Sequence, residues 1–147
     1  VDVAWKATEP EGDSGQFPLL LLPYDSIRLA SGSVGNPPFV TKTVADTVLK
    51  KDDMFVEINR ETALEFGLKE GTKVMLTTPL GEANVRVHLS NGIMPGIVAM
   101  PTGLGHTAFD EFLAGKGANI NTLIGPVEDA ASGFDAAWGI RAKLVKA

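Results

Sequence analysis

The side chains best suited to chemistry gather in two loops of the 147-residue chain. His106 follows Gly103-Leu104-Gly105, and Asn119 and Asn121 lie in a glycine-rich stretch from residue 115 to 123. Glycine lets a backbone approach a flat ligand closely, while amide and imidazole groups can meet that ligand's polar edge. These residue types predict a binding surface.

The same residues do not form a recognisable catalytic set. The chain has no cysteine, so it can supply no thiolate nucleophile, disulfide or cysteine-ligated metal centre. His88 stands in an alternating pattern typical of a surface or packed histidine, which leaves one loop histidine and no assembled triad. Gly103-Leu104-Gly105 lacks the third glycine and the βαβ pattern of a dinucleotide fingerprint, and there is no Walker A motif.

The charge and the apolar patterning of the chain argue against two classes of partner, nucleic acids and membranes. The net charge of −5 opposes binding to a polyphosphate backbone, so we expect no nucleic-acid partner. The longest apolar run, residues 17–22, is far shorter than the roughly 20 residues that span a bilayer, so we expect no membrane insertion.

Apolar and alternating patterns predict the elements that position the loops. Residues 17–24 are expected to form a strand buried on both faces, and Pro79-Leu80-Gly81 is expected to be a hairpin turn. Further strands are expected at 54–58, 72–78, 82–89, 97–100 and 138–144, the last through Trp138. About six strands fit a small barrel or sandwich.

Two short helices are expected between the strands. Asn59 can cap a helix over Arg60–Phe66 that ends at Gly67, and this helix is expected to bury Ala63, Leu64 and Phe66. A second is expected through Phe109, Phe112 and Leu113. The acidic, turn-rich residues 1–16 predict a linker or fragment start, and residues 17–147 a single domain.

A series of short motifs follows Phe17 in a defined order. They are Leu19–Tyr24, Gly35-Asn36-Pro37-Pro38, Val56-Glu57-Ile58-Asn59, Ala63…Gly67-Leu68…Gly71, Val74…Thr78-Pro79…Gly81, Pro95-Gly96, Gly105-His106-Thr107, Gly117-Ala118-Asn119 and Ser132-Gly133. This order resembles the C-terminal, molybdopterin dinucleotide-binding domain of the molybdopterin oxidoreductases, the group of dimethyl sulfoxide reductase, polysulfide reductase and formate dehydrogenase.

The resemblance implies a mainly-β, six-stranded double-psi β-barrel with one to three short helices. Its loops would cover molybdopterin guanine dinucleotide, with molybdenum or tungsten held by the parent enzyme, so the isolated domain is not expected to be active. The cofactor-binding residues it implies are Asn121 first, then Asn119, with Asn36, Ser31, Gly105 and His106 supplying further contacts.

The resemblance also implies the surroundings of the domain. Its partners would be the other domains of the same parent chain, together with iron–sulfur and membrane subunits of a respiratory redox complex. A periplasmic location is implied, with the cytoplasm as the alternative.

Other functions fit the same barrel. One alternative is a non-enzymatic double-psi barrel, either a protein-recognition module or a structural domain in a relative that has lost its cofactor. Another is a small self-processing decarboxylase, which needs a Gly-Ser cleavage point, but the loop composition around Gly32-Ser33 explains that pair equally well.

Overall fold

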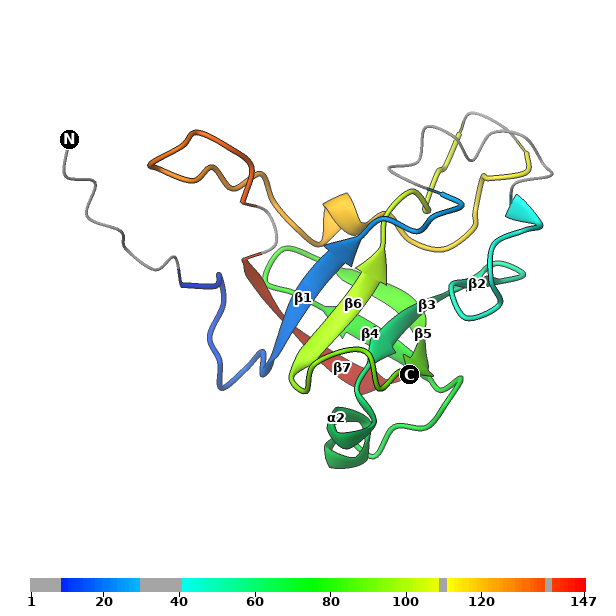
Figure 1. The fold of residues 1–147 in the computed structure, drawn as a ribbon, viewed down its shortest axis with the longest axis horizontal. Helices are drawn as coiled ribbons and strands as arrows, with labels where there is room; N and C mark the ends of the chain where they lie inside the picture. Colours follow the sequence, from blue (N-terminus) through cyan, green and yellow to red (C-terminus); the bar gives the residue numbers. More distant parts are fainter. Residues whose placement is uncertain (1–8, 30–40, 109–110, 137–138) are drawn as a thin grey trace.

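A closed barrel of six strands forms the centre of the computed structural model, which describes residues 9–29, 41–108, 111–136 and 139–147 (Figure 1). Its strands are β1 (Leu19–Tyr24), β3 (Asp53–Ile58), β4 (Lys73–Thr77), β5 (Glu82–Leu89), β6 (Ile97–Pro101) and β7 (Ile140–Lys146). They follow the order β3-β5-β4-β7-β1-β6, and pairing between β6 and β3 closes the ring. A two-residue strand, β2 (Leu49–Lys50), adds to the edge of β3.

The barrel is mixed, because β1 pairs with β6 and β3 with β5 in parallel while the other neighbours are antiparallel. Parallel neighbours cannot be joined by a tight hairpin and need long crossover connections. The connections that follow β1 and β6 gather at one end of the barrel, and the helix α2 (Arg60–Glu65) lies at the other (Figure 1). The prediction of a mainly-β, six-stranded double-psi barrel is confirmed.

In β5 and β7 the side chains alternate between the barrel interior and its surface. In β5 the interior residues are Ala83, Val85 and Val87, and β7 repeats the pattern. The expectation that residues 17–24 are buried on both faces is wrong, because Leu22 is 41% exposed while Leu19 and Leu21 are buried. A barrel has a single packed interior, so only every second residue of β1 reaches it.

The predicted helix is confirmed with one change in its packing. Asn59 caps α2 by accepting a hydrogen bond from Glu61 N at 2.9 Å, and Gly67 follows the C-cap with a φ of +62°. The helix buries Thr62 and Ala63, whereas Leu64 is 79% exposed, so its predicted burial is wrong. A single short helix lying across the barrel end buries only one narrow stripe.

The second predicted helix is not present in the described part of its range, because residues 111–115 form turns. Leu113 is nevertheless 2% exposed, so a buried side chain there reflects loop packing. Phe109 and Trp138 lie outside the described residues. Among the residues that the structure describes, no helix is long and apolar enough to cross a membrane.

The start of the described chain contacts the last strand. Glu11 forms an isolated bridge with Ile140, and Phe17 is buried beneath the Nζ of Lys143, 5.3 Å from the ring centroid. The domain boundary between residues 16 and 17 stays a prediction.

An ion pair joins the parallel strands β3 and β5. Nε of Arg86 donates to Oδ2 of Asp53 at 2.6 Å, and Nη1 of Arg86 donates to the carbonyl oxygen of Gly71 at 2.9 Å. The hydrogen bond from Arg86 lowers the pKa of Asp53 below 3.8, and the charges of Arg86 and Lys73 act in the same direction.

The ion pair predicts acid sensitivity. Because the pKa of Asp53 is lower in the folded chain, its stabilisation is complete above the unfolded pKa of about 3.9 and disappears as pH falls through the folded value. We expect Asp53→Asn to lower the free energy of unfolding at pH 6, and the deficit to shrink below about pH 4. Urea unfolding from pH 6 to 3 measures this difference.

The neighbouring Asp52→Asn is the control, because its exposed carboxylate has no hydrogen bond or ion pair with the described residues. An equal deficit for Asp53→Asn at pH 3 and pH 6 would contradict the prediction.

Candidate ligand-binding site

Four of the six predicted binding residues line one hollow at the loop end of the barrel. Its volume is about 410 Å³, within the range of small-molecule sites, and its walls include Gly103, Gly105, His106, Thr107, Asn119 and Asn121. Ser31 and Asn36 lie outside the described residues, so their place in the site stays a prediction.

His106 has a buried ring atom that nothing satisfies. Its Nε2 is shielded from solvent and has no hydrogen-bond partner among the described residues. The backbone around it is fixed, because the carbonyl oxygen of His106 accepts from Gly115 N at 2.9 Å and Gly105 N donates to Lys116 O at 2.8 Å. An unsatisfied buried polar atom costs about 1–3 kcal/mol, so a polar ligand atom at this position would be stabilising.

The two asparagines have different roles. Asn119 is the N-cap of a short 3-10 helix, η1 (Ile120–Thr122), and its Oδ1 accepts from Asn121 N at 3.0 Å. Its Nδ2 is left to donate. The exposed amide of Asn121 makes no hydrogen bond with any described residue, so both of its polar atoms are available to a ligand.

Gly105 permits the loops to meet. A Cβ atom at this position would overlap the backbone nitrogen of Asn119 and the carbonyl carbon of Ala118, and the φ of +80° also favours glycine. This close approach brings His106 to the same hollow as residues 119–123, which we call the asparagine turn. The contribution of Gly105 is therefore the spacing between the two loops.

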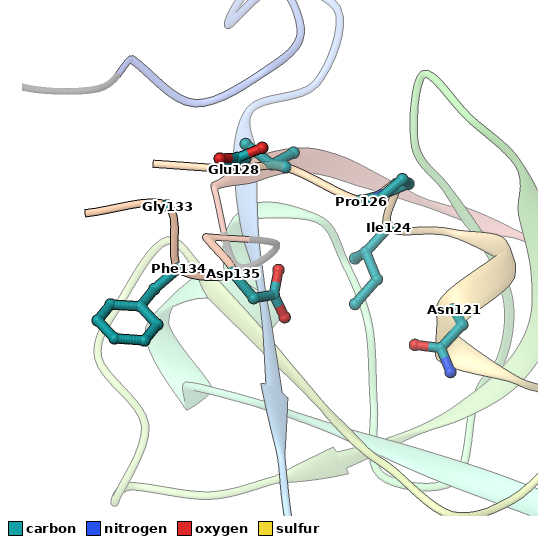
Figure 2. A pocket seen from close by; sticks show the side chains of 9 residues that line it. Asn121, Ile124, Pro126, Glu128, Gly133, Phe134 and Asp135 are labelled. Carbon is teal, nitrogen blue, oxygen red and sulfur yellow. The ribbon is translucent and has the colours of Figure 1, made fainter. Parts of the chain in front are cut away.

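Asn121 also borders two neighbouring hollows. One, of about 610 Å³, lies along residues 124–135, and Figure 2 shows Asn121 and Phe134 on opposite sides of it with Ile124 and Asp135 between them. The other, of about 300 Å³, is bordered by Tyr24 and Asp25. Of residues 124–135, the sequence analysis singled out only the Ser132-Gly133 motif. It missed the adjacent Phe134, which lines this hollow and is 76% exposed.

The titratable groups near these hollows do not form a catalytic set. Burial raises the pKa of Tyr24, whose phenol donates to Oε1 of Glu57 at 3.2 Å, so this hydroxyl stays protonated at neutral pH. Hydrogen bonds from Ser132 lower the pKa of Asp129. Within the described ranges, no group of three or more His, Asp or Glu residues is placed to hold a metal ion. The geometry supports binding and orientation of a polar ligand.

Comparison with known proteins identifies one family. Residues 34–137 match the family model described as the molydopterin dinucleotide binding domain.

Several relatives share the sequence. The chain is 36% identical over 99% of its length to the menaquinone reductase, molybdopterin-binding-like subunit, of Nitratidesulfovibrio vulgaris, and covers 21% of that protein. It is 32% identical over 92% of its length to the arsenate respiratory reductase molybdopterin-containing subunit of Shewanella sp. strain ANA-3, and covers 17% of it. The chain thus spans about one fifth of the length of these relatives.

The fold also occurs in a solved structure. Acetylene hydratase from Pelobacter acetylenicus superposes with a TM-score of 0.74 at 16% identity, over 97% of this chain and 21% of that one.

Substitution of Gly105 tests the loop contact. Gly105→Ala combines an unfavourable φ with a backbone overlap, whereas Gly115→Ala, at a φ of +75°, meets no atom within 4 Å. We expect Gly115→Ala to cost about 1–2 kcal/mol of unfolding free energy, and Gly105→Ala to cost about 1–3 kcal/mol more. Urea unfolding of the two variants measures the difference, and equal losses would show that the close approach is not needed.

Proposed function

This chain belongs to the molybdopterin dinucleotide-binding domain family, and from that premise we propose that it covers molybdopterin guanine dinucleotide within a larger oxidoreductase. One observation carries the proposal: His106, whose Nε2 is unsatisfied, and Asn121, whose amide makes no hydrogen bond with the described residues, line the same hollow. The domain would bind and orient the cofactor and would not react alone.

The donor set fits a pterin. A pterin is a flat fused ring with amide-like donors and acceptors along its edge, and such an edge is met by asparagine and histidine side chains. Asn121 would both donate and accept, Asn119 would donate through Nδ2, and His106 would use Nε2. Ser31 and Asn36, which follow β1 in the sequence, are proposed to add contacts.

The cofactor would supply a molybdenum or tungsten ion for redox chemistry, and this chain would supply its surroundings. In this role the loops that carry Asn121 and His106 would exclude water from one side of the pterin. Exclusion of water strengthens each polar contact in the site, because the local dielectric falls.

The relatives support further proposals about the parent protein. Two of them are named as subunits of reductases, and one of these as respiratory. We propose that this domain works with other domains of the same longer polypeptide and with iron–sulfur and membrane subunits, in the periplasm.

A second function is a structural barrel that no longer contacts the cofactor. The observation in its favour is the name of the relative at 36% identity, which is called molybdopterin-binding-like. In that case the hollow beside His106 would be filled by protein from the rest of the parent.

Cofactor content separates the two functions. The full-length parent, purified from its native source, is denatured and oxidised, and its pterin fluorescence and its molybdenum and tungsten are measured per polypeptide. A near-stoichiometric metal with about two pterins supports the proposal. Absence of both supports the structural barrel.

The contribution of Asn121 is tested in the same protein. Asn121→Leu removes a donor and an acceptor, and loss of about 1 kcal/mol per hydrogen bond predicts at least about fivefold weaker retention of pterin. Asn84→Leu, an equal change at an exposed position of β5, is the control and is expected to retain the pterin. Equal retention in both variants would remove Asn121 from the site.

A further inference from the structure

The turn that carries Asn121 is bound to the tip of the β4–β5 hairpin, residues 78–81. Thr78, the first residue after β4, is 3% exposed, and its Oγ1 donates to the carbonyl oxygen of Leu123 at 2.7 Å. The Oγ1 of Thr78 also accepts from the backbone nitrogens of Leu80 and Gly81, each at 3.2 Å. One hydroxyl therefore joins the hairpin tip to the end of η1.

Other contacts keep the two segments together. A Cβ at Gly81 would lie 2.5 Å from the carbonyl oxygen of Thr122, and one at Gly125 would lie 2.9 Å from Leu80. The hairpin tip thus lies directly against residues 122–125. At Gly81 a larger side chain would meet backbone and displace the asparagine turn, whereas at Gly125 it would meet only the flexible end of Leu80.

Contact with the hairpin adds to the support of the asparagine turn. The turn's own hydrogen bonds, from Thr122 N to Asn119 O at 3.1 Å and from Leu123 N to Ile120 O at 2.8 Å, belong to a 3-10 helix, whose hydrogen-bond geometry is poorer than that of an α-helix. Leu123 is fully buried two positions after Asn121, so fixing its carbonyl oxygen fixes the last anchor of the turn. We propose that Thr78 is a positioning residue, which holds Asn121 in the orientation that binds the cofactor without touching the cofactor itself.

The barrel provides a matched control for this role. Thr62 is the other buried polar residue among those the structure describes, 1% exposed, and its Oγ1 accepts from Gly96 N at 3.0 Å. It lies in α2, at the end of the barrel opposite η1 (Figure 1). Replacing either threonine by valine removes one buried hydroxyl of the same size, and only Thr78 contacts the asparagine turn.

The inference rests on the proposed function, and its test compares Thr78→Val, Thr78→Ser and Thr62→Val in the full-length parent. Three quantities are measured on folded protein: pterin per polypeptide, amide hydrogen exchange of peptides covering residues 119–123, and the thermal midpoint. We expect Thr78→Val to lose about fivefold in pterin retention and to exchange faster at 119–123. Thr78→Ser, which keeps the hydroxyl, is expected to restore both.

Thr62→Val is expected to lower the thermal midpoint by a similar amount while keeping the wild-type pterin content and exchange at 119–123. If Thr78→Val does not fold, Thr78→Ala removes the same hydroxyl with less crowding at the hairpin tip. Equal pterin loss in the two valine variants, or unchanged exchange at 119–123 in Thr78→Val, would overturn the positioning role. A wild-type parent without pterin would overturn the proposed function and this inference with it. Retention of pterin by every variant is a distinct outcome, which would overturn this inference alone.

Discussion

Pairing of β3 with β6 closes the barrel, and the arrangement of the loops depends on that closure. Two residue pairs, Glu57 with Ala99 and Ile58 with Val98, join strands that lie far apart in sequence. Once the ring is closed, the parallel pairs force long connections across its ends. The parallel pairing of β1 with β6 places the ends of these strands side by side, where Thr102 N donates to Tyr24 O at 2.9 Å, and the residues after them share one end of the barrel.

Close approach between two backbone segments at this end of the barrel forms the candidate site. Gly105 lies against the backbone of Ala118 and Asn119, and the loop that carries His106 is tied to residues 115 and 116 by two backbone hydrogen bonds. The folded domain thereby keeps Nε2 of His106 buried without a partner, which lowers its stability. Such a cost is reasonable at a binding site, because a ligand that completes the hydrogen bond recovers it.

The proposed site would separate residues that contact a ligand from residues that orient them. Asn119 and Asn121 lie two residues apart in one loop, yet Asn119 caps η1 while the side-chain amide of Asn121 makes no hydrogen bond with any described residue. Behind them, Thr78 and Gly81 of the hairpin tip contact the turn from another part of the barrel. Because a fold does not by itself specify a function, the proposed binding role rests on this division as well as on the family fold.

Local patterns in the sequence determined the strands, the Asn59 cap and the Pro79-Leu80-Gly81 hairpin. They also determined the two loops that carry His106 and Asn121. Alternation, capping and turn formation act over a few residues, so a local pattern is enough to predict them. The tertiary structure decided that Leu64 faces solvent, that only alternate residues of β1 are buried, and that Phe134 borders a hollow. It also decided which asparagine is free and which threonine holds the turn. These properties depend on contacts such as Thr78 with Leu123, 45 residues apart, and no local pattern encodes contacts that form only when the barrel closes.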